Sequence, residues 1–345
     1  MPEFAIYDVA KAAEFLKSRR SVLVMCHNNP DGDAIGSSLS LVTILRALGK
    51  EARAVCPSEI PEKLEFLAEG EDFSYSDGDE EKYDALVTVD VASRGQLGRL
   101  SPLTTKVDLM IDHHAKGEAF APNLIRPEAS AAAEIIFDIY EIYKRTGDIG
   151  SLPDAARYIF AAISSDTGSF KYNNATPHTF RVAADLVEEI TESDDGGYDA
   201  SDLSRLLHDT MTEKDQKIAN MVADRIKLYE DGALAMCLIT ADIMASLDAD
   251  DKDFGGAIDV VRSRKGVIVA VTVRQSVSDS GTFKISARAA SDIDVSEVCG
   301  KFGGGGHKRA AGATIYAKTP EEAYNAAQDA FSAAVREFKG GKHDE

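Results

Sequence analysis

Short apolar runs alternate with longer amphipathic stretches through the first half of the chain. Short strand-like runs occur at 21–26 and 51–56, and nearly continuous apolar runs, which are typical of strands buried on both faces of a sheet, occur at 85–90 and 107–112. Helical patterns separate or follow these runs, at 36–49, 129–145, 153–165 and 176–190. The alternation predicts an α/β fold with a doubly wound, mostly parallel sheet.

The pattern changes near residue 190, where an acidic, glycine-containing segment begins. A helical stretch at 203–226 leads to further strand-like runs and to a last helix from about Pro320. These features predict a smaller α+β domain in the C-terminal part of the chain. We therefore expect a first domain over 1–195, a helical linker over 196–228 and a second domain over 229–345, with an active-site cleft between the two domains.

Composition narrows the class of protein. The chain has 345 residues, four scattered cysteines and a formal net charge of −20. Such a charge argues against a broad basic surface for duplex DNA. No apolar run approaches the roughly 18–20 residues that a membrane span needs, and the amphipathic start of the chain lacks the order of a signal peptide. We expect a cytoplasmic protein with reduced cysteines and no membrane contact.

Acidic and imidazole side chains stand where the predicted strands end. The first three groups follow separate apolar runs, and the fourth follows the helical run 153–165: His27, Asp31 and Asp33; Asp90; Asp112, His113 and His114; and Asp166. In open α/β sheets, ligands bind outside the carboxyl ends of the strands. Carboxylates crowded at such an edge repel one another unless cations neutralise them. The pattern therefore predicts a metal site.

The residue types restrict the metal. Oxygen and imidazole ligands without cysteine suit Mn²⁺, Mg²⁺ or Fe²⁺ better than a structural zinc. Six or seven ligands exceed what one ion needs, but they suit two ions about 3.5–4 Å apart that share a carboxylate and clamp a phosphoryl group. Gly32, between Asp31 and Asp33, is expected to let the backbone turn tightly between these two ligands.

The second domain carries a separate candidate site. Residues 303–306 are all glycine, and His307 follows them directly. Such a backbone allows a phosphate or nucleotide to approach its N–H groups closely, although a flexible loop is the alternative. Arg288 could bind phosphate or stack on a base. We expect the substrate to be held by Arg288, Gly304, Gly305, Gly306 and His307.

Several segments together resemble a known family. HNNPDGDAIGS at 27–37, Asp90, DHH at 112–114 and SDTGSF at 165–170 are similar to the motifs of the DHH phosphoesterases. GGGGHKRAAG at 303–312 resembles their DHH-associated domain. Within the family, the chain is most similar to the stand-alone nano-RNases, also called oligoribonuclease and pAp phosphatases. The first domain then corresponds to the metal-binding phosphoesterase domain, and the second to the substrate-binding domain.

The resemblance implies a site with two Mn²⁺ ions, for which Mg²⁺, Co²⁺ or Fe²⁺ are alternatives. It implies two ligand sets that share Asp90: His27, Asp31 and Asp90 for one ion, and Asp33, Asp90, His113 and Asp166 for the other. His114 would then face the scissile phosphate, and Asp112 would orient a neighbouring histidine. The chain departs from the family pattern at Gln96, where relatives often have arginine, and Arg94 lies nearby.

The resulting hypothesis is a manganese-dependent phosphoesterase that degrades very short oligoribonucleotides to nucleoside monophosphates, or converts 3′-phosphoadenosine 5′-phosphate to AMP. One alternative is a phosphodiesterase for cyclic-di-AMP or for a linear dinucleotide such as pApA or pGpG. The alternative that is not an enzyme is a catalytically inactive nucleotide-binding sensor. The complete set of metal ligands argues against this alternative. The oligomeric state is left open, with a homodimer as one option, because dimers are common for such folds.

Overall fold

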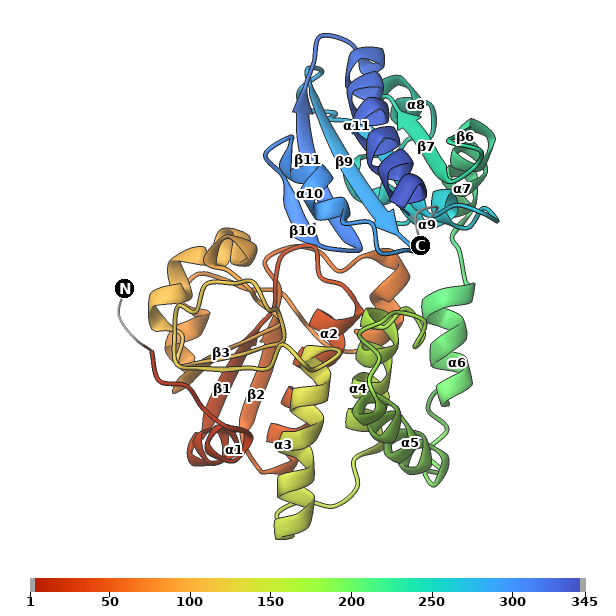
Figure 1. Cartoon of the computed structure of the whole chain (residues 1–345). Helices are drawn as coiled ribbons and strands as arrows, with labels where there is room; N and C mark the ends of the chain where they lie inside the picture. Colours follow the sequence, from red (N-terminus) through yellow and green to blue (C-terminus); the bar gives the residue numbers. More distant parts are fainter. Residues whose placement is uncertain (1–3, 342–345) are drawn as a thin grey trace. The chain divides into compact units, whose positions relative to one another are not determined.

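The computed structural model describes residues 4–341 and divides into two compact units, with the boundary between Thr210 and Met211. This boundary falls within the segment 196–228 that we expected to link two domains. Each unit contains a sheet of its own. Figure 1 labels the helices and strands of both units.

The first unit contains a five-stranded sheet in the order β2-β1-β3-β4-β5. All neighbouring strands in it are parallel. The strands are β1 (Ser21–Met25), β2 (Glu51–Val55), β3 (Ala85–Val89), β4 (Leu109–Asp112) and β5 (Asn123–Ile125). The α/β fold class with a parallel sheet is thus confirmed. β5 was not predicted, because three residues are too few to show a period.

Both faces of this sheet are covered, which explains the continuous apolar runs. Val22 and Val24 belong to a core shared with the helices, whereas Leu23 and Met25 pack with leucines of the 3-10 segment Arg94–Lys106. The helices are α1 (Val9–Ser18), α2 (Gly32–Ala47), α3 (Ala132–Thr146), α4 (Pro153–Asp166), α5 (Pro177–Thr191) and α6 (Ala200–Ser204). Short 3-10 turns lie at Glu62–Leu67 and Asp79–Lys82.

Helix α2 begins earlier than predicted, at Gly32 rather than at residue 36. The side chain of Asp31 accepts hydrogen bonds from the N–H groups of Asp33 and Ala34, and it therefore caps the helix. Our interpretation of Gly32 as a turn residue was wrong. A Cβ at Gly32 would lie 2.5 Å from Ser165 Oγ, and one at Gly36 would lie 2.5 Å from the Tyr158 carbonyl oxygen. Both glycines allow α2 to approach α4 closely.

This close contact yields a first prediction. Replacing Gly36 with alanine is expected to lower the free energy of unfolding by about 1–3 kcal/mol, the usual cost of overpacking. The added methyl group meets backbone of α4, which cannot rotate away as a flexible side chain can. Thermal unfolding of the purified variant measures the effect.

Gly150 offers a matched control. A Cβ there would meet no described atom within 4 Å, so Gly150→Ala should change stability by less than about 0.5 kcal/mol. Equal unfolding temperatures for Gly36→Ala and Gly150→Ala would contradict the proposed close contact.

The second unit contains a six-stranded mixed sheet in the order β10-β11-β9-β8-β7-β6. Only β7 and β8 pair in parallel among its described neighbours. The strands are β6 (Lys227–Tyr229), β7 (Leu234–Ile239), β8 (Val269–Gln275), β9 (Thr282–Ala289), β10 (Gly305–His307) and β11 (Ala310–Tyr316). The helices are α7 (Glu213–Arg225), α8 (Ala241–Ser246), α9 (Ala257–Arg262), α10 (Val295–Gly300) and α11 (Pro320–Gly341), with a 3-10 turn at Asp251–Phe254.

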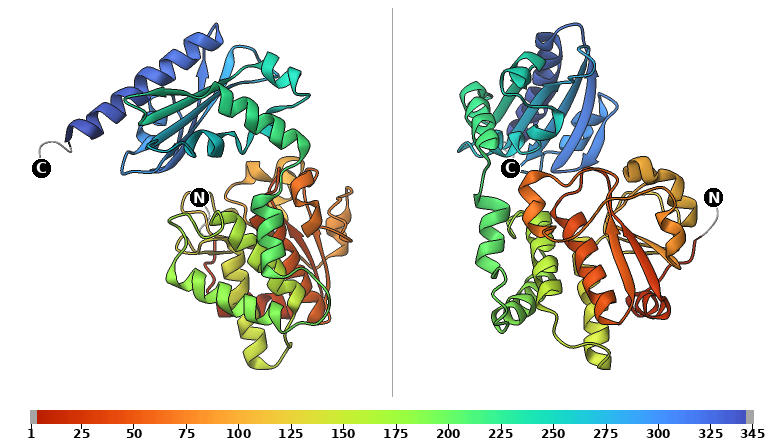
Figure 2. Two further views of the ribbon diagram at one scale, coloured as in Figure 1. Left: turned by 90° about the vertical axis from the view of Figure 1, so that its right-hand side faces the viewer. Right: turned by 180° about the vertical axis from the view of Figure 1, so that it is seen from behind.

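Helices cover both faces of this sheet as well. Helix α11, which runs along the sheet in Figures 1 and 2, contributes Phe331 and Val335 to the core on one face. On the other face, Val222 of α7 and Val261 of α9 pack with Cys237 of β7. The smaller α+β domain predicted from the sequence is therefore present.

The helix predicted over 203–226 is interrupted. A π-helical turn at Arg205–Asp209 follows α6, and α7 begins anew after Thr212. The Thr212 side chain accepts from the Asp215 N–H, and Asp215 accepts in return from the Thr212 N–H. This capping box starts a second helix where the residue pattern suggested continuity.

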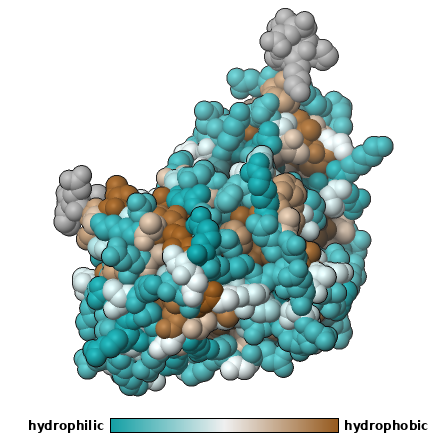
Figure 3. Space-filling view, turned by 90° about the horizontal axis from the view of Figure 1, so that it is seen from below, coloured by the Kyte–Doolittle hydropathy of each residue, from teal (hydrophilic) through white to brown (hydrophobic). Residues whose placement is uncertain are grey.

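Polar groups dominate the face of the molecule seen in Figure 3, and its hydrophobic side chains form separate patches. Among the described residues, no helix combines the length and apolar character needed to cross a bilayer. All four cysteines are free and buried, as expected from their scattered positions.

Candidate metal centre

The strand ends of the first unit bring the predicted ligands together. Three groups have potential ligand atoms within 4.8 Å of one another: His27, Asp31 and Asp90; Asp33, His113 and Asp166; and Asp90, His113 and His114. All six residues predicted as metal ligands occur in these groups. The donor set consists of carboxylate oxygens and imidazole nitrogens, so the groups are suited to divalent cations.

His27 anchors the first group. Its Nε2 lies 3.3 Å from Asp90 Oδ2 and 3.8 Å from Asp31 Oδ1. Its Nδ1 lies 2.9 Å from the Asn28 carbonyl oxygen, which can only accept, so Nδ1 carries a proton and Nε2 faces the carboxylates. Although burial alone would lower the pKa of His27, the nearby carboxylates of Asp31 and Asp90 raise it to about 11. The position thus favours a positive charge, which a metal ion can supply.

His113 occupies the corresponding place in the second group. Its Nε2 lies 3.4 Å from Asp166 Oδ2 and 3.8 Å from Asp33 Oδ2. Its Nδ1 lies 3.3 Å from the Ala129 carbonyl oxygen, which orients the ring in the same manner. Burial lowers the pKa of His113, but the nearby carboxylates of Asp90, Asp33 and Asp166 raise it to about 10.

Asp90 lies between the two groups. Its oxygens are 3.3 Å from His27 Nε2 and 3.6 Å from His113 Nε2. Asp90 is 2% exposed, and within the described part of the chain its Oδ1 has no hydrogen-bond partner. Its backbone is left-handed, with φ 56°. A buried carboxylate oxygen without a donor is costly unless a cation binds it, so the residues present fit a pair of ions that share Asp90.

The other carboxylates show how crowded the centre is. Burial, together with the charge of Asp90, raises the pKa of Asp33 to about 7. Burial and the charge of Asp33 raise the pKa of Asp166 to about 8. The histidines have the opposite effect on Asp90: burial alone would raise the pKa of Asp90, but the nearby imidazoles of His113 and His27 lower it. Divalent cations would relieve this repulsion among the carboxylates.

Asp33 is held in place by the start of α3. Its Oδ2 accepts from the Ala132 N–H at 2.7 Å, and its Oδ1 accepts from the Ala133 N–H at 3.1 Å and from Ser37 Oγ at 2.7 Å. Free N–H groups at a helix N-terminus favour a carboxylate. We had not predicted a role for Ser37, although its spacing of four residues from Asp33 on one helix is the signal that reveals it.

Asp112 orients His114. Its Oδ1 lies 2.8 Å from His114 Nδ1 and also accepts from the His113 N–H at 2.8 Å. Because Nδ1 of His114 donates to Asp112, Nε2 is the ring atom left for a ligand. The hydrogen bond with Asp112 raises the pKa of His114, although burial opposes this effect. This geometry suits a residue that donates a hydrogen bond or a proton.

The structure explains Gln96, which stands where relatives often have arginine. Gln96 Oε1 accepts from the N–H groups of Ala92 and Ser93, so its side chain stabilises the turn after β3. Arg94 donates to Thr104 Oγ1 at 3.1 Å and lies 3.5 Å from a carboxylate oxygen of Glu118. The two side chains therefore have local partners in the fold.

Three of the four glycines in the run of the second unit fall into two kinds of position. A Cβ at Gly304 would lie 2.2 Å from the Gly312 carbonyl oxygen, and one at Gly306 would lie 2.6 Å from that of Ala310. A Cβ at Gly305 would meet none of the described atoms within 4 Å. Packing therefore explains the glycines at 304 and 306, whereas the fold does not require glycine at 305.

His307 and Arg288 lie in one cross-strand row. His307 of β10 is opposite Ala310 of β11, which is opposite Arg288 of β9. Side chains directly opposite one another point to the same face of a sheet. The small side chain of Ala310 thus separates two side chains, those of His307 and Arg288, that can bind an anion. His307 lies on the same strand as Gly305.

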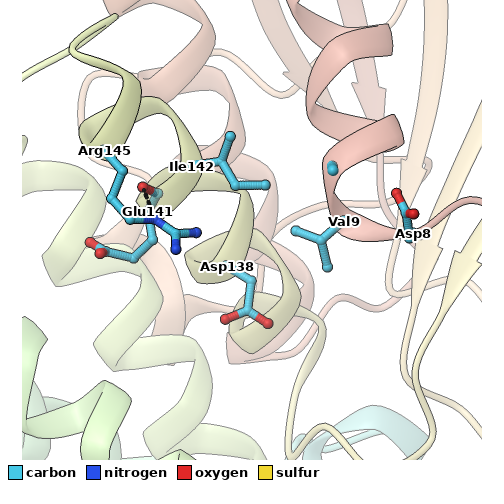
Figure 4. Close-up of a pocket in the computed structure, with 7 residues that line it drawn as sticks. Asp8, Val9, Asp138, Glu141, Ile142 and Arg145 are labelled. Carbon is cyan, nitrogen blue, oxygen red and sulfur yellow. Dashed lines mark hydrogen bonds between the residues drawn. The ribbon is translucent and has the colours of Figure 1, made fainter.

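Figure 4 shows a surface pocket between α1 and α3 that is separate from both groups of predicted site residues. Its lining residues come from the start of α1 and from α3, and include Asp8, Val9, Asp138, Glu141, Ile142 and Arg145. The Nε of Arg145 donates to the Glu141 carbonyl oxygen at 3.1 Å. No residue of the predicted metal or substrate sites lines this pocket.

Comparison with known proteins identifies both units. Residues 21–163 match the N-terminal domain of the DHH family, and residues 231–337 match the DHHA1 domain. A bifunctional oligoribonuclease and PAP phosphatase, NrnA, of Thermus thermophilus is 29% identical over 316 residues, which are 90% of each chain. The cyclic-di-AMP phosphodiesterase GdpP of Geobacillus thermodenitrificans is 26% identical over 95% of this chain but 49% of its own.

A solved structure supports the fold. The exopolyphosphatase-related protein of Bacteroides fragilis has a TM-score of 0.80 with 24% identity, and the match covers 96% of each chain. At this identity the likeness establishes the shared fold of parallel sheet and second α/β unit.

Proposed function

Because the chain belongs to the DHH family of metal-dependent phosphoesterases, we propose that it hydrolyses very short oligoribonucleotides to nucleoside monophosphates and 3′-phosphoadenosine 5′-phosphate to AMP. The observation that carries this proposal is Asp90, a buried carboxylate shared by two groups of histidine and aspartate ligands. The similarity to NrnA over 90% of each chain supports the choice of substrates.

The proposed site assigns a role to each side chain. His27, Asp31 and Asp90 would hold one divalent ion, preferentially Mn²⁺. Asp33, Asp90, His113 and Asp166 would hold the other. When bound, such a pair lowers the pKa of a water molecule and neutralises the oxygens of a phosphoryl group. His114, kept protonated at Nδ1 by Asp112, would hydrogen-bond the scissile phosphate or protonate the leaving oxygen through Nε2.

The proposed substrate-binding residues lie in the second unit. His307 and Arg288 would bind a phosphate across Ala310, and the backbone of Gly305 would approach the ligand closely. A domain that grips a second phosphate or a base would explain a preference for a short strand with a charged end. We propose that binding by the second unit, rather than the metal site, selects the substrate.

Gly305 allows the substrate-binding role to be tested. Gly305→Val is expected to reduce kcat/KM for a dinucleotide by at least about tenfold, or roughly 1.4 kcal/mol, because the side chain would fill space needed by the ligand. Its unfolding temperature should stay unchanged, since an edge strand tolerates valine. Steady-state kinetics with the dinucleotide and with bis-p-nitrophenyl phosphate measure the two effects.

The small ester is the internal control, because it carries no second phosphate or base for the second unit to bind, and its slow hydrolysis should persist in Gly305→Val. Gly304→Val is the matched structural control: its side chain would collide with the Gly312 backbone and lower stability. Normal dinucleotide turnover by Gly305→Val would remove Gly305 from the substrate site.

The similarity to GdpP keeps a second candidate function, hydrolysis of cyclic-di-AMP or of linear pApA or pGpG. The chain spans 49% of the length of that relative. The chemistry at the metal centre would be the same as for an oligoribonucleotide, since a phosphodiester bond is hydrolysed in both cases.

Product analysis discriminates the candidates. The purified protein with Mn²⁺ is incubated with a dinucleotide, a pentanucleotide, a 24-mer RNA, pAp, cyclic-di-AMP and pyrophosphate. Release of nucleoside monophosphates from the dinucleotide and of AMP from pAp, faster than turnover of the 24-mer, would support the proposal. Turnover of cyclic-di-AMP alone would favour the second candidate, and turnover of none would favour a nucleotide-binding sensor.

A further inference from the structure

Asn174 connects a segment that carries one candidate ligand of the metal centre with a segment that positions two others. It lies between α4 and α5, and its Nδ2 donates to the carbonyl oxygen of Ser130 at 3.0 Å and to that of Asp166 at 3.1 Å. These acceptors belong to the segment before α3 and to the last residue of α4. One side-chain amide thus joins segments that are far apart in the sequence.

Both segments determine the arrangement of the second ligand group, Asp33, His113 and Asp166. Asp166 itself provides a carboxylate. The residues around Ser130 hold the other two members: the Ala129 carbonyl oxygen orients His113, and the N–H groups of Ala132 and Ala133 bind Asp33. Asn174 therefore fixes the backbone of Asp166 relative to the segment that positions its two partners.

The segment between Asp166 and Asn174 has a strained backbone. Ser169 and Phe170 are both left-handed, with φ 58° and 60°. Such conformations in non-glycine residues persist where surrounding contacts enforce them, and they often occur near functional sites. The bond from Asn174 to the Asp166 carbonyl joins the two ends of this segment, so it helps to hold Asp166 against the strain.

Chemistry fixes the orientation of the amide. Both partners of Asn174 are carbonyl oxygens, so the NH₂ group must face them. Its Oδ1 is then left buried, without a hydrogen-bond partner among the residues described. An aspartate of the same shape would instead place an oxygen against two carbonyl oxygens.

We propose that Asn174 is a positioning residue that gives the second ligand group its affinity for a metal ion. This inference rests on the proposed function, because it concerns the same metal centre. It adds a residue that is absent from the ligand set and that acts through the backbone of Asp166 and the start of α3.

The test measures metal binding rather than turnover. Chelator-treated protein is titrated with Mn²⁺ by calorimetry. The unaltered protein should bind two ions, and Asn174→Asp should retain one ion while its affinity for the second falls at least about tenfold. The signal of a coupled Mn²⁺ pair in electron paramagnetic resonance should weaken in parallel.

Because Asn174→Asp adds a negative charge, the direction of the change in metal affinity is informative. A nearby carboxylate by itself attracts cations, so electrostatics alone would strengthen metal binding in Asn174→Asp. A weakened second site would therefore report the lost hydrogen bonds. The exposed neighbour Asn173 provides the matched control, since Asn173→Asp adds the same charge one residue away and should bind two ions as before.

Asn174→Ala removes both hydrogen bonds without adding charge, and it should weaken the same site. Two normal binding events in Asn174→Asp and Asn174→Ala would overturn the inference. Failure of both variants to fold would also overturn it, because Asn174 would then support the whole unit. If the unaltered protein binds two ions but hydrolyses none of the nucleotides, the proposed function fails while the metal titrations still decide the role of Asn174.

Discussion

Replacing Asp90 with asparagine is expected to reduce kcat/KM for a dinucleotide by at least about a thousandfold, or roughly 4 kcal/mol in the barrier. Asp90 lies close to His27 and His113, the two histidines predicted as metal ligands, so its loss should disturb both ions at once. Asparagine is preferred to alanine because the backbone at Asp90 is left-handed, a conformation that asparagine tolerates well. Steady-state kinetics and metal analysis of the purified variant measure the effect.

The control for this variant is Asp185→Asn. Asp185 is an exposed aspartate on α5, outside the three candidate metal groups, so this change should leave kcat/KM within about twofold of its usual value. A tenth of normal activity remaining in Asp90→Asn would show that Asp90 is not the shared ligand.

Removal of divalent ions is expected to abolish hydrolysis completely and reversibly. The predicted ligands are carboxylates and imidazoles, so Mn²⁺ should restore activity better than Ca²⁺, which prefers six to eight oxygen ligands. The assay treats the protein with excess chelator, removes the chelator and adds each ion separately. Full activity in excess chelator, with no metal detected by mass spectrometry, would contradict a metal-dependent mechanism.

The clustering of the candidate metal ligands could be predicted from the topology of a parallel sheet. Strands with apolar residues on both faces indicate a covered parallel sheet, and all carboxyl ends of such strands meet at one edge. His27, Asp90 and His113 each follow a different strand, so the fold class alone brings them together. The sequence also contains Asp166, but its approach to Asp33 depends on the contact between α2 and α4.

Other features of the site could not be predicted from residue types. The glycines at 32 and 36 are required by contacts with α4, which a sequence pattern read along one helix does not show. Asn174 acts on two backbone carbonyls, and every residue has such a group, so its partners leave no trace in the sequence. The row of His307, Ala310 and Arg288 likewise depends on strand register.

The boundary after Thr210 has a consequence for biosynthesis. Every candidate metal ligand lies between His27 and Asp166, and the first unit closes its own sheet and core without residues from the second. Domains generally fold as units from the N-terminus while the chain is being made. We therefore expect the nascent chain to acquire its metal centre on the ribosome, before the strands that carry Arg288 and His307 have been translated.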